Sequence, residues 1–305
     1  MERVIFGDNQ FFGINHSSEE KSRAQAIRFK ENQAIVEVLD IAIAEGIQTF
    51  MCTTHDRIAD ICETLRADSK YENFTIYPCM PYAHKYSNAV TELGIMGSIK
   101  QYLPGNIFST LAKGGMAFVK KDFIAMMELM IDAEMKMFKG ISTPVIFLQN
   151  VVTDLLLGLG MSDFLVGFHH YVRHKYKAEA GFITMNLPLL LNVLESRGIE
   201  NPTICASINK LGFRMSGGKE VYEKTIAEKR CRLIAMQVFA AGAIPPKEAL
   251  EYVCNMDGIE SILFGASSRG NIRNSKSLID AFTEKRRESF VDPSNKQTAD
   301  NYLSL

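Results

Sequence analysis

The chain has 305 residues, 47% of them hydrophobic, and a formal net charge of −1, so it can bury a large core and has no global field that would attract nucleic acid. The N-terminus lacks a basic region followed by an apolar one, so we expect no signal peptide. The longest apolar run, residues 151–166, is interrupted by polar side chains, so we expect no membrane span. Six cysteines without a CxxC pair are typical of reduced thiols and predict a cytoplasmic globular protein; homo-oligomer formation stays open.

Apolar strand-like runs alternate with helical patterns through the first half of the chain. The predicted strands are residues 3–7, 47–52, 74–80 and 145–148. Helical spacing occurs at residues 33–44, 58–65, 87–103, 122–138 and 162–178. Residues 104–120 are glycine-rich and read as a loop over one end of the fold.

The same alternation continues to the C-terminus. The predicted strands are residues 181–185, 203–208, 233–239 and 261–264, and the helices lie at 189–195, 220–229, from 246, and 275–282. Eight buried strands that alternate with helices predict an α/β protein, a single (β/α)8 TIM barrel. We place the barrel at residues 1–285 and a polar tail at 286–305.

Polar side chains gather where the predicted strands end. Because the chemistry of a (β/α)8 barrel sits on the loops after its strands, these side chains are the candidates for a site. They are Asp8, Asn9, Gln10, His16, Thr53, His55, Asp56, Tyr82, Gln149, Asn186, Asn209, Lys210, Gln237, Ser267, Ser268, Arg269 and Arg273.

The stretch from Ser261 to Asp280 carries the strongest signal. An apolar run is followed by Gly-Ala-Ser-Ser, by two arginines at 269 and 273, and then by a helical pattern. Free backbone N–H groups, hydroxyls, a helix dipole and guanidinium forks together favour an anion, most simply a phosphate. The alternative interpretation is a strand-to-helix turn with solvated arginines.

The C-terminal half resembles the aldo-keto reductase superfamily. The segment PKEALEYVCNMDGIESILFGASSRGNIRNSKSLI, residues 246–279, is similar to that family's last helix, strand, phosphate-binding turn and helix. Residues 220–244 and 181–209 follow the same layout, and the N-terminal half follows more weakly through AIVEVLDIAIAEGIQTF. The resemblance covers most of the chain and is specific over roughly its last 125 residues.

The resemblance implies NADP as cofactor. It would place a phosphate of NADP on Ser267, Ser268 and Arg269, with Arg273 and Asn274 nearby, and it would place Asn186 and Asn209 near the nicotinamide. The family's catalytic residues are not matched: Met51 stands at the aspartate position, strand three has no lysine, and Gln149 stands where histidine is expected. Met236 replaces the aromatic residue that stacks on nicotinamide. His55, Asp56 or Tyr82 could serve as the acid instead.

Four functions remain open. The first is a divergent reductase of a small carbonyl compound, with His55 or Tyr82 as the proton donor. The second is a lyase, aldolase or isomerase on a phosphorylated small molecule, with a Schiff base on Lys210 or proton transfer by Asp8, His16 or His55. The third is a metal site made by Asp8, His16 and His55, although we predict no bound metal. The fourth is a non-catalytic barrel that only binds its ligand.

Overall fold

Eight parallel strands form a closed barrel in sequence order, and β8 pairs back onto β1. The protein is represented by a computed structural model that describes residues 1–13, 18–81 and 124–291, with side chains up to residue 286. The strands are β1 (Val4–Gly7), β2 (Thr49–Thr53), β3 (Thr75–Met80), β4 (Val145–Leu148), β5 (Glu179–Thr184), β6 (Thr203–Ser207), β7 (Arg232–Met236) and β8 (Ile259–Phe264). This confirms the predicted (β/α)8 barrel.

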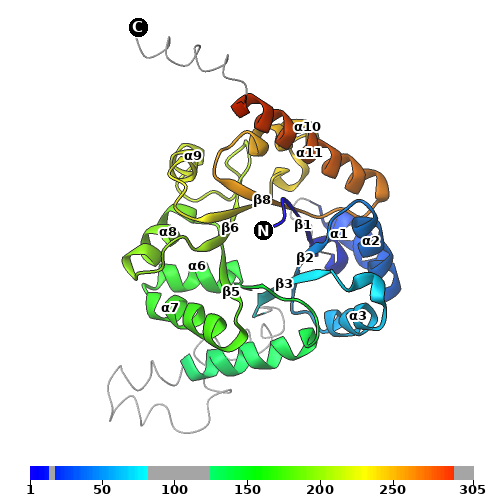
Figure 1. Ribbon diagram of the computed structural model, residues 1–305, viewed down its shortest axis with the longest axis horizontal. Coiled ribbons are helices and arrows are strands. Elements are labelled where there is room, and N and C mark those ends of the chain that lie inside the picture. The colour runs from blue at the N-terminus through cyan, green and yellow to red at the C-terminus, as the bar shows by residue number, and fades with distance from the viewer. Residues whose placement is uncertain (14–17, 82–123, 292–305) are drawn as a thin grey trace.

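Helices form a ring around the strands (Figure 1). They are η1 (Asn9–Phe12), α1 (Glu19–Arg28), α2 (Asn32–Ala44), α3 (Asp56–Ala67), η2 (Ser69–Tyr71), the helical residues 124–135 with η3 (Lys136–Phe138), α6 (Asn150–Gly158), α7 (Ser162–Tyr171), the π-helical η4 (Val172–Tyr176), α8 (Leu187–Ser196), α9 (Lys219–Ala227), η5 (Ala240–Gly242), α10 (Pro246–Cys254) and α11 (Arg269–Val291). The predicted helix 87–103 and loop 104–120 lie outside the described residues. Within the described ranges, no helix is long and apolar enough to cross a membrane.

Two helices differ from the prediction. The sequence predicts no helix at residues 150–158, where the structure has α6, whereas α7 begins at Ser162 as predicted; a turn at Gly160, which has a left-handed φ of 67°, separates the two helices. The last helix begins at Arg269 rather than at Ser275 and extends past Lys285 to Val291. Its first turn is polar except for Ile272, which is fully buried, so hydrophobic periodicity is too weak there to mark the start.

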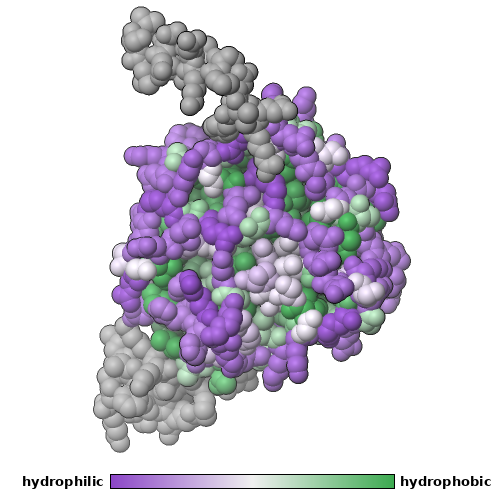
Figure 2. Space-filling view, in the orientation of Figure 1, coloured by the Kyte–Doolittle hydropathy of each residue, from purple (hydrophilic) through white to green (hydrophobic). Residues whose placement is uncertain are grey.

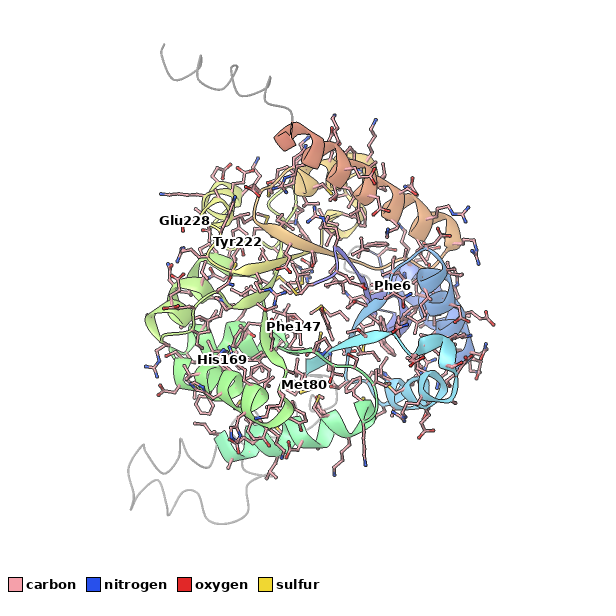
Figure 3. The ribbon with its side chains drawn as sticks, viewed as in Figure 1. Phe6, Met80, Phe147, His169, Tyr222 and Glu228 are labelled. Atoms are coloured by element: carbon pink, nitrogen blue, oxygen red, sulfur yellow. The ribbon has the colours of Figure 1, made fainter. Side chains whose placement is uncertain are left out.

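The barrel interior is filled by side chains. Ile5, Met51, Tyr77, Cys79, Val145, Phe147, Ile183, Cys205, Ile234 and Met236 form one buried cluster inside the strands. Phe147 projects toward the barrel centre (Figure 3), and its ring centroid lies 6.0 Å from that of Tyr77. Burial raises the pKa of the Cys205 thiol, which keeps it protonated as a small core residue.

An ion-pair network closes the amino end of the barrel. Arg232, at the start of β7, binds the carboxylates of Glu179 at 2.6 Å and Glu260 at 2.9 Å. The N-terminal ammonium of Met1 also contacts Glu260 at 2.7 Å, and Figure 1 shows the N-terminus near the middle of the ring of strands. In the view of Figure 2, hydrophilic residues cover most of the rim of the molecule, with hydrophobic atoms visible between them. Ion pairs at the amino end of a (β/α)8 barrel contribute to its stability, whereas the chemistry of such barrels lies at the opposite end.

Candidate functional site

Asp8 is a buried carboxylate at the carboxyl end of the barrel. It follows β1 directly, and its side chain is 6% exposed. The Thr53 backbone N–H and the Thr53 hydroxyl both donate to Asp8 Oδ2 at 2.7 Å, so the end of β2 fixes the carboxyl group. Burial raises the pKa of Asp8 despite these hydrogen bonds, which oppose the rise. A carboxyl group with this environment can hold a proton and give it to a substrate.

His55 lies on the loop after β2, two residues beyond the Thr53 that binds Asp8. It caps α3 by accepting the Arg57 N–H at Nδ1 (3.1 Å), which makes Nε2 the protonated nitrogen of the neutral ring. Its ring stacks on Phe12, with centroids 4.3 Å apart and planes 9° apart. Asp56 is the next residue and is exposed in the first turn of α3. His55 is thus a second oriented candidate for the proton donor, whereas Asp56 is exposed and lacks the burial that distinguishes Asp8.

Polar contacts also link the ends of β5, β6 and β7. Asp154, from α6, accepts from the Thr184 hydroxyl at 2.5 Å and from the Met185 amide at 3.0 Å. The fully buried Ser207 hydroxyl lies 2.8 Å from Gln237 Oε1 and 2.9 Å from Met185 Sδ. Gln237 has a φ of 54°, a left-handed backbone that is uncommon outside glycine and is often found at functional sites.

The two asparagines expected near a nicotinamide serve the local backbone in this structure. Asn209 is fully buried; its Nδ2 donates to the Phe213 carbonyl at 2.9 Å, and its Oδ1 accepts the Phe213 N–H at 2.8 Å. Asn186 caps α8 through a longer bond, 3.4 Å, from the Leu189 N–H. Lys210 is exposed and pairs with Glu248 at 2.7 Å, so it lacks the desolvation that a Schiff-base lysine needs.

Asn209→Ala is expected to lower the free energy of unfolding by about 2–3 kcal/mol, because both backbone polar groups of Phe213 lose their partner at a buried position. Asn186→Ala removes one long cap bond and should cost about 0.5–1 kcal/mol. Urea unfolding of the two variants measures this difference. An Asn209→Ala protein with unchanged stability and weakened cofactor binding would instead favour the nicotinamide role.

The turn after β8 is tightly fitted. A Cβ atom at Gly265 would lie 2.1 Å from Oε1 of the buried Gln10, whose Nε2 donates to the Gly7 carbonyl at 2.7 Å. A side chain at position 265 would therefore displace the carboxamide of Gln10. Ser268 precedes α11, and its Oγ accepts the Asn271 N–H at 3.3 Å. The 23-residue helix α11 thus opens directly at the predicted anion-binding turn.

Arginines from two parts of the chain surround this turn. Arg28, the last residue of α1, donates to the Ser267 carbonyl oxygen. Arg269 and Arg273 extend from the first turns of α11 and pair with Glu45, the residue after α2. Asn274, predicted to lie nearby, is exposed on α11. The turn therefore combines hydroxyls, a helix N-terminus and three cations, a set that suits an anionic ligand.

Several parts of the predicted site are not tested by this arrangement. His16 and Tyr82 lie outside the described residues. In the described ranges, no group of three or more His, Cys, Asp or Glu side chains could hold a metal ion, but without His16 this leaves the Asp8–His16–His55 hypothesis open. Two cavities, of about 560 and 270 Å³, are lined by residues of the loops that lead into β6, β7 and β3, such as Glu200, Arg230 and Ser69. Since these loops enter the amino ends of the strands, we assign the cavities no chemistry.

Three residues that contribute to the candidate site are not predicted from the sequence. Arg28, at the end of α1, and Glu45, directly after α2, are far from the turn in sequence and carry no local signal. Asp154 was read only as an interruption of an apolar run, yet it bonds to the end of β5. In each case the contact depends on closure of the barrel, which brings distant helices together.

Comparison with known proteins identifies the fold. Neither a protein-family model nor a curated protein sequence matches the chain. Among solved structures, a proposed aldo-keto reductase from Pseudomonas aeruginosa aligns with a TM-score of 0.58 and 10% identity over 92% of this chain and 90% of that one. An aldo-keto reductase from a Medee basin deep-sea metagenome library gives 0.53 and 8% over 86% and 88%. A glycerol dehydrogenase from Gluconobacter oxydans gives 0.51 and 10% over 94% and 91%.

These similarities extend over nearly the full length of both chains in each pair. They agree, at the level of the fold, with the resemblance seen in the C-terminal sequence. The chain has the (β/α)8 barrel fold of the aldo-keto reductases.

Proposed function

We propose that the protein is a divergent aldo-keto-reductase-like oxidoreductase that binds NADP(H) at the strand-8 turn and acts on a small carbonyl compound. The observation that carries the proposal is the turn itself, where Ser267 and Ser268 open α11 between Arg28, Arg269 and Arg273. A phosphate there would meet charge-assisted donors and the positive end of a helix dipole. The shared barrel fold adds support.

The residues present fit the phosphate end of the cofactor better than its nicotinamide end. Asn209 is fully buried and both ends of its amide bind the backbone of Phe213, and Met236 lines the barrel interior where an aromatic residue would stack. Asn186 remains available at the modest cost of one long cap bond. A bound NADP(H) would supply the hydride for carbonyl reduction.

Among the residues that the structure describes, Asp8 is the best candidate for the accompanying proton transfer. It is buried at the carboxyl ends of β1 and β2, its orientation is fixed by Thr53, and its raised pKa favours the protonated form. Asp8 would donate its proton to the carbonyl oxygen of the substrate. It would thereby take the role of the family's catalytic residues that this chain does not match. His55, with its proton on Nε2, is the second candidate.

A titration with NADPH tests the proposal. We expect micromolar affinity or better for the purified protein, and at least ten-fold weaker binding by Arg269→Gln/Arg273→Gln, which removes two guanidinium forks. Arg23→Gln is a matched control, since Arg23 is an exposed arginine on α1 whose one ion-pair partner among the described residues is Glu19. A flat titration of the unmodified protein would overturn the NADP(H) assignment.

The second candidate is an acid–base lyase or isomerase that binds a phosphorylated small molecule at the same turn. It is favoured by the engagement of Asn209 in its own loop, which leaves the nicotinamide end poorly supported while Asp8 and the arginines remain. The exposed Lys210–Glu248 pair disfavours the Schiff-base form of this hypothesis. Binding of a sugar phosphate that is lost in Arg269→Gln/Arg273→Gln, without NADPH binding, would select this function.

A further inference from the structure

The carboxylate of Glu45 pairs with the guanidinium groups of Arg269 and Arg273 beside the strand-8 turn. Its Oε1 and Oε2 accept Arg273 Nε at 3.1 and 3.2 Å, and Arg273 Nη2 lies 3.0 Å from Oε1. Arg269 Nη1 is 3.8 Å from the same oxygen. The side chain of Glu45 is 14% exposed, whereas those of Arg269 and Arg273 are 58% and 63% exposed. The Glu45 carboxylate is thus the most buried of these three charged side chains.

A carboxylate in this position changes which ligands the arginines can accept. A phosphate needs the same charge-assisted donors and is repelled by a neighbouring negative charge. A hydroxyl group is not repelled and can donate to a carboxylate oxygen. In dinucleotide-binding folds an acidic residue binds the ribose 2′-hydroxyl of NAD, and an arginine accommodates the 2′-phosphate of NADP. Here both residue types meet at one turn.

Because Glu45 is mostly buried, it cannot simply swing into solvent when a phosphate arrives. Its position at the end of α2 is held by backbone bonds from its N–H to the carbonyls of Ile41 and Ala42. If a ligand separated Arg269 and Arg273 from Glu45, the mostly buried carboxylate would be left without its two cations. The negative charge therefore remains beside any ligand that the arginines bind.

We propose that Glu45 determines the preference of this site between NADP(H) and NAD(H). The inference rests on the proposed dinucleotide function. In the unmodified protein the carboxylate reduces the advantage of the 2′-phosphate, and the two cofactors bind with similar affinity. Removal of its charge frees the forks of Arg273 and Arg269 and shifts the site toward NADP(H).

The test compares NADPH and NADH by calorimetric titration of the full chain. Glu45→Gln keeps the shape of the side chain, and we expect NADPH to bind at least ten-fold more tightly while NADH changes less than two-fold. Glu37→Gln is the matched control, because Glu37 is an exposed glutamate on α2 that makes neither hydrogen bonds nor ion pairs among the described residues; both affinities should stay unchanged. Arg273→Gln should weaken NADPH at least ten-fold and leave NADH nearly unaffected.

The outcomes separate this inference from the function on which it rests. If NADPH binds but its affinity relative to NADH is the same in Glu45→Gln and the unmodified protein, the role of Glu45 is overturned and the reductase proposal stands. An equal gain for both dinucleotides would likewise overturn it, since it would show a general charge effect. If neither dinucleotide binds any of these proteins, both proposals fall. Should Glu45→Gln not fold, Glu45→Asp, which withdraws the carboxylate, and Arg273→Gln decide the question.

Discussion

Replacement of Asp8 by asparagine is expected to lower kcat by two to four orders of magnitude, the usual contribution of a general acid. The free energy of unfolding at neutral pH should be unchanged or slightly increased. Both hydrogen bonds from Thr53 end on Oδ2, so an asparagine carbonyl oxygen can accept both of them. The substitution removes an ionisable proton and a buried charge while the local hydrogen bonds survive.

The pH dependence provides an independent check of the same residue. Burial raises the pKa of Asp8 in the folded protein above its unfolded value, which is about 3.9. A proton donor works while it is protonated, so the rate of carbonyl reduction should fall as the pH rises through the folded pKa. In the window between the two pKa values the native state binds more protons than the unfolded state, so the contribution of Asp8 to stability also falls as pH rises. In Asp8→Asn, the fall in rate and the fall in stability that Asp8 causes with rising pH should both be absent.

The measurements are steady-state reduction of a panel of small aldehydes and ketones with NADPH, and urea unfolding between pH 4 and 8. Asp56→Asn is the matched control, because Asp56 is a nearby but exposed carboxylate in the first turn of α3. If Asp8→Asn remains fully active and His55→Gln is inactive, the proton donor is His55. A protein that binds NADPH but reduces no carbonyl in the panel would favour the non-catalytic barrel.

The strands could be predicted from the sequence because each is an apolar run closed by small or polar residues. Strand β4 was predicted at its observed bounds, and the others within one to three residues. A parallel barrel strand is buried on both faces, so hydrophobicity alone marks it. Helices were harder where their exposed faces are polar, as in the first turn of α11.

The candidate site was predictable only in part. The Ser267–Ser268 turn is encoded locally, by a strand, small residues and a helix in succession. The ion pair between Arg273 and Glu45 joins residues 228 positions apart, and no local sequence pattern predicts it. The two hydrogen bonds between the Asn209 side chain and the backbone of Phe213 depend on the detailed path of one loop. Sequence therefore indicates where a site lies, while the pairing of its side chains needs the folded chain.

Gly181→Ala is expected to destabilise the protein by about 3 kcal/mol, at the upper end for overpacking in a core. A Cβ atom at this position would lie 2.3 and 2.4 Å from Cε1 and Cδ1 of Phe147. The two residues are register partners on the paired strands β4 and β5, and Phe147 is fully buried. The ring covers the glycine, and neither the hydrogen-bonded strands nor the packed ring can move away cheaply.

A double-mutant cycle isolates this contact. Phe147→Leu alone should cost about 1–2 kcal/mol from lost burial. In the Gly181→Ala background the same change removes the clash, so the double variant should be more stable than Gly181→Ala alone, with a coupling energy of about 1–3 kcal/mol. Gly198→Ala is a control for the introduced methyl group without a clash, although its φ of 77° adds local backbone strain.

The result bears on function because Phe147 lies in the filled interior below the carboxyl ends of the strands. If the interior is packed as closely as these distances require, a ligand must lie above it, among Asp8, the β5–β7 polar contacts and the strand-8 turn. Additive effects in the cycle, or a Gly181→Ala protein of unchanged stability, would show instead that the interior has room. A ligand could then lie deeper in the barrel than Asp8, which would contradict the assignment of Asp8 as the proton donor.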